Sequence, residues 1–315
     1  MLVGDMDLSI IIVSFNTKDL TCECLQSIYD QTKSVSFEVW VVDNDSCDGS
    51  ADMIEREFPQ VHLIRSGSNI GVAAAANIGL KASTGRYVLT LNSDTVIVDG
   101  AMDRLVCFMD THPDAGGATG RLIRPDGSEH PKLFGNPPTL KLQILVALSA
   151  FHKRFADIAN SVKFGEYDDY SRTQHVPCVW WGTCFIVRRE AMEQAGMQDP
   201  RFFIYSEDVD WAMNIVKAGW KLYYVSDAEV IHYGGQSTKQ ASVKMMAMQW
   251  KNACRLIQKH YGFIFGTILR LVVAAVFGIR MIKWLVLYPI RRGMQKKEAF
   301  GISHMWAVIR GVLTY

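Results

Sequence analysis

The pattern of apolar and polar positions divides the first third of the chain into alternating strands and helices. Short runs rich in β-branched residues predict buried strands, and the stretches between them have helical length and periodicity. Strands that alternate with helices are usually parallel and joined by right-handed crossovers, so the pattern predicts an α/β domain. The predicted strands are 8–15, 37–43, 61–66 and 87–92, and the predicted helices are 17–31, 50–58 and 71–83.

The middle of the chain is less regular. Residues 120–178 carry most of the prolines, and an apolar stretch at 140–152 is their one predicted helix. Beyond them the apolar pattern predicts further strands and a helix that Ser206 can cap and Gly219 ends. The predicted strands or extended segments are 179–187, 221–226 and 229–233, and the predicted helix runs to about residue 218.

The C-terminal segment is apolar but interrupted by cations. Arg270, Arg280 and Lys283 leave no uncharged run of the roughly eighteen residues that a spanning helix needs. At 100° per residue these cations share one side of a helix, and the opposite side is apolar. The pattern is typical of an amphipathic helix at a membrane surface, with a helix packed on the body as the alternative.

Charge supports the same division. The formal net charge is +1, but residues 251–315 hold eleven basic residues and one acid, whereas the remainder holds 22 basic and 31 acidic residues. An acidic body with a basic, apolar tail suggests a catalytic or binding domain tethered to an anionic membrane surface through residues 263–297. No nucleic-acid partner is expected. The seven cysteines lack zinc-site spacing, and no secretory leader is evident, which indicates reduced thiols and a cytosolic location.

Polar residues follow each of the first four predicted strands. Ligands of open α/β sheets bind at the carboxyl ends of the strands, so these residues are candidates for one binding site. They are Ser14 and Asn16, Asp43, Asn69, and the Asn92-Ser93-Asp94 turn. A nicotinamide-dependent oxidoreductase is disfavoured, because SFNTKDL (14–20) contains none of the glycines of a dinucleotide fingerprint.

Three carboxylates crowd the start of the helix predicted after Ser206. Glu207, Asp208 and Asp210 lie within four positions, behind the aromatic pair Phe202 and Phe203. An acidic first turn favours the helix dipole, which accounts for one or two acids more readily than three. The crowding therefore indicates a general base whose proton affinity is raised by its acidic neighbours and by partial burial.

Seven segments, taken in order, resemble family 2 inverting glycosyltransferases with the GT-A fold. The similarity is greatest to the bacterial rhamnosyltransferase-like branch and covers about residues 6–240. It implies a Rossmann-like, mixed and mostly parallel sheet flanked by helices over 1–240, with a basic amphipathic, membrane-associating region over 241–315. The segments are SIIIVSFN, VVDNDSCDGS, NIGVAAAANIGL, LNSDT, WWGTCFIVRRE, FFIYSEDVDWAMNIVKAG and HYGGQST.

Carried over position by position, the resemblance assigns roles to individual residues. Asp208 corresponds to the catalytic base. Asn92-Ser93-Asp94 matches a relaxed D-x-D motif, in which Asp94 is the main metal ligand and His232 completes the metal or diphosphate site. The residues implied to surround the nucleotide, diphosphate or sugar are Ser14, Asn16, Asp43, Asn69, Asn77, Asn92, Ser93, Asp94, Trp181, Gly182 and Glu207, with Trp180 next to them.

The resemblance also implies a reaction and its partners. The expected activity is transfer of a hexose, rhamnose from dTDP-rhamnose, to a lipid-linked glycan in bacterial cell-surface polysaccharide or O-antigen synthesis. A divalent cation, Mg²⁺ or Mn²⁺, is expected at the diphosphate, and the enzyme is expected on the cytoplasmic face of the inner membrane. A UDP-sugar donor, an inactive nucleotide-sugar-binding partner and a homodimer remain open alternatives.

Overall fold

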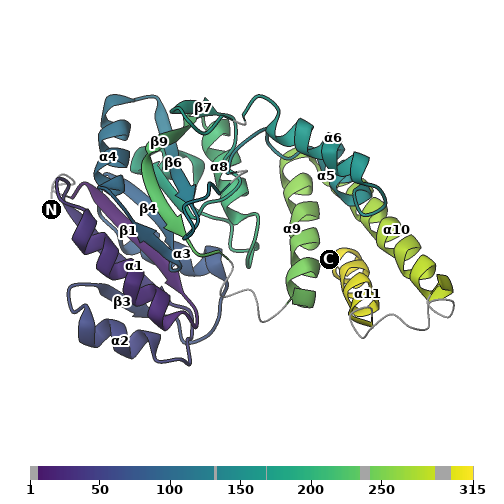
Figure 1. Ribbon diagram of the computed structural model, residues 1–315, viewed down its shortest axis with the longest axis horizontal. Helices are drawn as coiled ribbons and strands as arrows, with labels where there is room; N and C mark the ends of the chain where they lie inside the picture. The colour runs from purple at the N-terminus through teal and green to yellow at the C-terminus, as the bar shows by residue number, and fades with distance from the viewer. Residues whose placement is uncertain (1–5, 131–132, 168, 235–241, 288–298, 315) are drawn as a thin grey trace. The chain divides into compact units, whose positions relative to one another are not determined.

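The computed structural model describes residues 6–130, 133–167, 169–234, 242–287 and 299–314 (Figure 1). The chain forms two compact units. The first comprises Met1–Asn136, Glu166–Phe203 and Glu207–Ser237, and the second comprises Pro137–Gly165, Ile204–Ser206 and Thr238–Tyr315. The boundary at residue 240 falls outside the described residues, so the division into 1–240 and 241–315 stays a prediction.

The first unit is a mixed sheet with flanking helices, which confirms the expected fold class (Figure 1). Its strands are β1 (Leu8–Ser14), β2 (Phe37–Asp43), β3 (His62–Arg65), β4 (Tyr87–Asn92), β5 (Thr95–Ile97), β6 (Ala115–Ile123), β7 (Gln174–Val176), β8 (Cys184–Arg188) and β9 (Lys221–His232). Its helices are α1 (Lys18–Gln31), α2 (Ser50–Glu57), α3 (Val72–Ala82), α4 (Ala101–Thr111), α7 (Arg189–Ala195) and α8 (Glu207–Lys217).

The sheet runs in the order β3-β2-β1-β4-β8-β6-β9-β5, with β7 paired to β9. Strands β1, β2, β3 and β4 pair in parallel, as the strand–helix alternation predicts. The other half is more mixed than expected, because β8 lies antiparallel between β4 and β6 while β6 and β9 are parallel. The register sets Ser14 opposite Asp43, so the polar ends of β1 and β2 lie side by side.

Helix α3 shows why its alanine-rich sequence suits this fold. It packs on β1 and β2, and a Cβ built on Gly79 would lie 2.7 Å from the Ile11 side chain. The small residues therefore allow the close approach that the sequence suggested. At the start of the helix, Gly71 has φ +87°, and its Cβ would lie 2.6 Å from the Phe203 carbonyl oxygen.

Several elements differ from those predicted. Strands β5, β6 and β7 and helices α4 and α6 were not expected, and helix 140–152 ends at Leu148. Strand 179–187 begins only at Cys184, and the segments 221–226 and 229–233 form one strand, β9. β6, with the sequence AGGATGRLI, shows the reason: its glycines resemble a turn but admit neighbouring side chains. A Cβ on Gly116 would lie 2.3 Å from Trp220.

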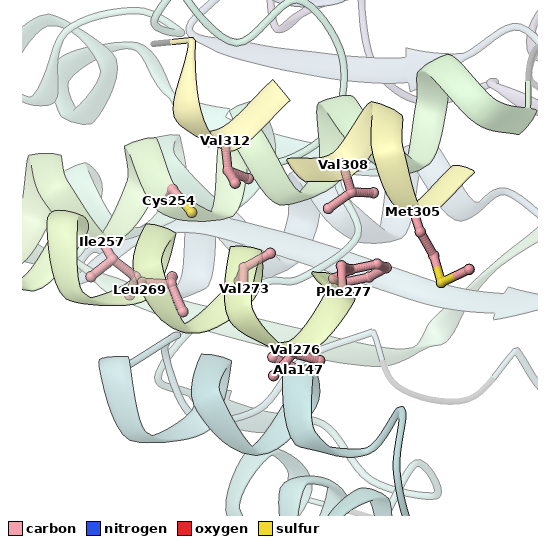
Figure 2. Close-up of a cluster of buried hydrophobic side chains, with 10 residues drawn as sticks. All are labelled: Ala147, Cys254, Ile257, Leu269, Val273, Val276, Phe277, Met305, Val308 and Val312. Carbon is pink, nitrogen blue, oxygen red and sulfur yellow. The ribbon is translucent and has the colours of Figure 1, made fainter. Parts of the chain in front are cut away.

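The second unit is helical. Its elements are α5 (Leu140–Leu148), α6 (Lys153–Phe164), α9 (Ser242–Tyr261), α10 (Phe263–Leu287) and α11 (Ala299–Leu313). Figure 2 shows side chains from α5, α9, α10 and α11 meeting in one apolar cluster. Leu269, Val273 and Phe277 of α10 are buried in it, beside Ile257 of α9 and Val308 of α11. This core explains why residues 137–165 group with the C-terminal helices.

Helix α10 buries one side and exposes another that is also apolar. Within the described residues, Phe263–Val286 is the one helical segment long and apolar enough to cross a membrane. Seven of its exposed apolar residues recur every three or four positions and form a row, here called the α10 stripe, on the side of the helix opposite Arg280. The α10 stripe consists of Ile264, Ile268, Leu271, Ala275, Ile279, Ile282 and Val286.

Candidate active site

The ends of β1 and β2 present one buried acceptor. Asp43 closes β2 and is 3% exposed; its Oδ2 accepts a hydrogen bond from the Ser46 N–H at 3.1 Å. Among the described residues, no hydrogen-bond partner reaches its Oδ1. A buried carboxylate oxygen without a donor is costly, so it fits a ligand that brings an N–H or O–H group.

Ser14 takes a different position from the one expected. Its hydroxyl lies 3.1 Å from that of Thr21, in a buried group of hydroxyls. Thr17 extends this group to Ser93, at 3.0 Å. Ser14 is fully buried and supports the turn after β4, and direct contact with a nucleotide stays a prediction that this geometry does not favour.

Two loops at the same sheet edge are tied together by asparagines. Asn16 has φ +53°, and its Oδ1 accepts from the Cys47 N–H at 2.9 Å, which joins the β1–α1 loop to the β2–α2 loop. Asn69 accepts from the Asn44 side-chain amide at 3.2 Å and from the Gly71 N–H at 3.2 Å. Asn69 therefore shapes the loop before α3, close to the end of β2.

Asn77 and Asn92 are held by protein groups. The Asn77 Nδ2 donates to the Gln198 carbonyl at 2.7 Å, and no described residue hydrogen-bonds to its buried Oδ1, so its contact with a diphosphate or sugar stays a prediction. The Asn92 amide lies 3.5 Å from the Thr183 hydroxyl, and its backbone N–H donates to the Thr183 carbonyl at 2.9 Å. Asn92 thus links the turn after β4 to the segment before β8.

Asp94 and His232 come together through the pairing of β5 with β9. Thr95 lies opposite His232, and the Tyr233 N–H donates to the Asp94 carbonyl at 3.0 Å. Both side chains are buried, and His232 Nε2 lies 3.3 Å from Asp94 Oδ1. Asp94 and His232 are 138 positions apart in the chain, and the sequence analysis assigned both to one predicted site. In the structure their side chains are in contact.

Two further rings border this pair. Trp181 is 37% exposed, and its ring centroid lies 6.3 Å from that of His232. His130 lies 4.4 Å from the Trp181 ring and 5.5 Å from the His232 ring, centroid to centroid. His130 was not expected from the sequence, because it lies in a polar loop after β6 where no motif marks it. An exposed tryptophan face is a common platform for a sugar ring.

Asp208 is oriented by the backbone beside Trp181. The Gly182 N–H donates to Asp208 Oδ2 at 2.7 Å, and the Val209 N–H donates to Oδ1 at 2.7 Å. A Cβ on Gly182 would lie 2.6 Å from the Asp208 Cβ, so only glycine fits here without a shift. Trp181 and Gly182 therefore connect the Asp94–His232 pair to Asp208.

The acidic cluster suggested a carboxylate with a raised pKa, and Glu207 is such a group. Burial and the neighbouring Asp208 raise the pKa of Glu207 to about 8. Its Oε2 is buried, and no described residue hydrogen-bonds to it. At pH 7 Glu207 is therefore mostly neutral, because burial and the charge of Asp208 favour its protonated form. Asp210 is fully buried on the same helix, and Asn214 donates to it at 3.3 Å.

Asp94 and His232 are the candidate ligands for a metal ion. Within the described part of the chain, no group of three His, Cys, Asp or Glu side chains could hold a metal ion. Mg²⁺ and Mn²⁺ often take one or two protein ligands and complete their coordination with phosphate oxygens and water. One carboxylate and one imidazole fit that partial role.

A surface hollow of about 600 Å³ lies elsewhere, along α1 and β5, and none of the predicted site residues lines it.

Comparison with known proteins identifies the family. Residues 9–196 match the family described as "Glycosyl transferase family 2", and residues 143–312 match "Glycosyl transferase family group 2". The chain belongs to glycosyl transferase family 2. This membership confirms the resemblance seen in the sequence at the level of the family.

Two relatives and one solved structure illustrate the range of the family. An N-acetylglucosaminyl-diphospho-decaprenol L-rhamnosyltransferase of Mycobacterium tuberculosis is 31% identical over 239 residues, 71% of this chain and 76% of that protein. An N-acetylglucosaminyltransferase of Bradyrhizobium diazoefficiens is 28% identical over 70% of this chain and 43% of that protein.

The solved structure is the mannosyltransferase PcManGT from Pyrobaculum calidifontis in complex with GDP-Man and Mn²⁺. It aligns with a TM-score of 0.56 at 16% identity, over 99% of this chain and 87% of that one. At this identity the likeness shows the fold alone, and the fold is GT-A as the sequence predicted.

Proposed function

We propose that this glycosyltransferase moves rhamnose from dTDP-rhamnose to a hydroxyl of a glycan carried on polyprenyl diphosphate, with inversion at the anomeric carbon. The observation that carries the proposal is the orientation of Asp208, whose carboxylate accepts from the Gly182 N–H. Gly182 follows Trp181, whose ring lies 6.3 Å from that of His232, the neighbour of Asp94. The relative from Mycobacterium tuberculosis, named as an L-rhamnosyltransferase for an N-acetylglucosaminyl-diphospho-decaprenol, supports this choice of sugar and acceptor.

The proposed chemistry is a single displacement. Asp208 takes the proton from the acceptor hydroxyl while that oxygen attacks the anomeric carbon, and the bond from this carbon to the diphosphate breaks. Asp94 and His232 would hold a divalent cation, Mg²⁺ or Mn²⁺, which when bound neutralises the charge that develops on the departing diphosphate. One displacement from the opposite face inverts the anomeric centre.

The donor would lie along the carboxyl ends of the parallel strands. Asp43 Oδ1, buried and without a described donor, would accept from the base or ribose. Asn16, Asn69 and Ser93 would shape the loops around the nucleotide and diphosphate, and Trp181 would meet the sugar.

The α10 stripe would rest on the anionic cytoplasmic leaflet of the inner membrane. Its seven members are apolar and exposed, and residues 251–315 carry a formal charge of +10, which complements such a lipid surface. The basic residues between 288 and 298 lie outside the described residues. A peripheral enzyme held in this way would meet an acceptor that cannot leave the membrane.

Turnover measured with a donor panel tests the proposal. Purified full-length protein is mixed with a polyprenyl-diphosphate GlcNAc acceptor, Mg²⁺ or Mn²⁺, and dTDP-rhamnose, UDP-GlcNAc, UDP-galactose or UDP-glucose. We expect transfer with dTDP-rhamnose and a product of inverted anomeric configuration. Transfer from a UDP-sugar alone would replace the donor assignment. Donor binding without transfer from any member would favour the inactive partner, and binding of NAD instead would favour an oxidoreductase.

Asp208→Asn tests the base in the same assay. We expect turnover to fall by about 10²–10⁴-fold, the usual contribution of a general base, while dTDP affinity stays within about twofold. The exposed Asp157→Asn on α6 serves as the matched control. Unchanged turnover in Asp208→Asn would remove Asp208 from the mechanism.

A further inference from the structure

The residues just before α8 adopt an unusual backbone conformation. Tyr205 has φ +69° and Ser206 has φ +74°, so two consecutive residues with side chains lie in the left-handed region. Such conformations are unfavourable for residues with side chains and persist where the surrounding structure holds them. Glu207 and Asp208 follow directly, so this turn sets the direction in which α8 begins.

One buried side chain on α9 holds the turn. Asn252 is 1% exposed, and its Nδ2 donates to the Ile204 carbonyl at 2.8 Å and to the Tyr205 carbonyl at 3.1 Å. The Arg255 guanidinium donates to Asn252 Oδ1 at 3.2 Å, which fixes the orientation of the amide. Both N–H groups of the amide thus face the two carbonyls that precede the strained residues.

The upstream end of the same segment is fixed separately. The Val72 N–H donates to the Phe203 carbonyl at 2.7 Å, and Gly71 permits this approach. Three successive carbonyls, those of Phe203, Ile204 and Tyr205, are therefore held before the chain enters α8. Beyond the turn, the Gly182 N–H donates to Asp208 Oδ2 at 2.7 Å and holds the carboxylate next to residue 182.

We infer that Asn252 is a positioning residue for the proposed base: by holding the Ile204 and Tyr205 carbonyls it stabilises the left-handed turn that aims Asp208 at the reacting hydroxyl. This inference rests on the proposed function. It assigns to α9, a helix of the second unit, an effect on the rate of sugar transfer in addition to its place in the helical core. A displacement of about 1 Å in a reacting group can reduce a rate by about 10²-fold.

Asn252→Asp is the direct test, because it keeps the size of the side chain and removes the donor. In full-length protein we expect kcat to fall by about 10–100-fold while the affinity for dTDP stays within about twofold. Hydrogen–deuterium exchange of the peptide covering residues 202–210 should accelerate by at least about fivefold. Normal exchange in this peptide, or normal kcat beside an inactive Asp208→Asn, would overturn the inference.

Cys254→Ala is the matched control on the same helix. Cys254 is 1% exposed in the apolar cluster, and its truncation leaves a cavity without touching the 204–205 carbonyls. We expect a lower Tm with normal kcat per folded molecule and normal exchange at 202–210. Equal losses of kcat in the two variants would show that Asn252 acts only through the stability of the helical core.

A second substitution, in the turn itself, tests whether Asn252 acts by stabilising the left-handed conformation. Glycine adopts positive φ without steric cost, so Ser206→Gly should restore part of the turnover of Asn252→Asp, by about threefold or more. If Ser206→Gly does not restore turnover and exchange at 202–210 stays fast, stabilisation of the left-handed turn is not the function of Asn252. Active Asp208→Asn protein would instead overturn the proposed base, and the inference with it, whatever Asn252→Asp does.

Discussion

At the scale of single residues, the position of the proposed base depends on one glycine. The Gly182 N–H holds Asp208 Oδ2 at 2.7 Å, and its missing side chain leaves room for the Asp208 Cβ. The same glycine follows Trp181, whose ring borders His232. A small change at residue 182 should therefore alter the rate without removing any charged group.

Gly182→Ala should reduce kcat by about 10²-fold, because the new Cβ would lie 2.6 Å from the Asp208 Cβ and must displace the carboxylate. Steady-state kinetics and dTDP titration measure the effect, and donor affinity should change little. Gly278→Ala is the control, since nothing lies within 4 Å of a Cβ there. A Gly182→Ala enzyme with normal kcat would contradict the assigned orientation of Asp208.

Glu207 predicts how stability depends on pH. Its pKa rises from 4.5 to about 8 on folding, so between these values the folded protein keeps a proton that the unfolded chain has lost. The free energy of unfolding should then fall as pH rises through this window, by at most about 1.4 kcal/mol per pH unit. Urea unfolding from pH 5 to pH 9 measures this slope.

Glu207→Gln should flatten the slope, and the exposed Glu193→Gln should leave it as in the unmodified protein. An unfolding free energy with the same pH dependence in Glu207→Gln would mean that Glu207 titrates normally in the folded state. The comparison needs no substrate, so it is independent of the proposed reaction.

The Asp94–His232 pair predicts metal-dependent nucleotide binding. We expect Asp94→Asn and His232→Ala each to weaken dTDP binding in Mn²⁺ by about 10–100-fold, and to have little effect in EDTA, because a bound cation would link these side chains to the diphosphate. Isothermal titration calorimetry with and without Mn²⁺ measures this. Equal losses in both conditions would indicate a structural role for the pair.

At the scale of elements, α10 has two apolar sides with different surroundings. Residues such as Leu269 and Val273 are buried in the helical core, whereas Leu271 is 60% and Ile282 59% exposed. An exposed apolar row of this length is unusual unless it meets a membrane or another protein. Periodicity alone located the cations on one side, but only the packing shows which apolar residues remain for a lipid surface.

Replacing four members of the α10 stripe with glutamine tests its role. Ile268, Leu271, Ile279 and Ile282 are exposed, so the variant should fold normally but co-sediment at least about tenfold less with anionic vesicles. Ile158→Gln, exposed on α6, is the control. Unchanged sedimentation would place the anchor elsewhere, and a switch from dimer to monomer in light scattering would identify the stripe as a dimer interface.

At the scale of the whole molecule, the helical unit is assembled from distant parts of the sequence. In the sequence, helices α5 and α6 lie between β6 and β7, yet α5 shares a core with α9, α10 and α11 (Figure 2). Removal of the C-terminal helices would therefore do more than release a membrane anchor. The remaining side chains, including Ala147 and Ile257, would lose their apolar neighbours.

Deletion of residues 263–315 should unfold this unit. The deletion removes seven buried apolar side chains, each worth about 1.5–3 kcal/mol, or on the order of 10 kcal/mol in total, which is comparable to the whole stability of a domain. Circular dichroism and thermal unfolding measure the loss. If the truncated protein is soluble, cooperative and merely released from membranes, the C-terminal helices act as a separable anchor.

The sequence predicted the parallel half of the sheet. β1, β2 and β4 and helices α1, α3 and α8 follow from local periodicity, which is strong because each is buried along one side or both. β6 was missed, because its glycines are required by Trp220 and Phe185, which lie far away in the chain. His130 was missed for a similar reason: only its contact with Trp181 marks it.

By itself, then, the amino-acid sequence determined the family, the α/β class and the side-chain chemistry available, since these depend on residue types in a fixed order. Only the tertiary structure decided which of those residues touch: that Ser14 is buried among hydroxyls, that Asp94 meets His232, and that Gly182 orients Asp208. The physical reason is that hydrogen bonds and close contacts require distances correct to within a few tenths of an ångström. Strand pairing and helix packing set these distances between positions remote in sequence.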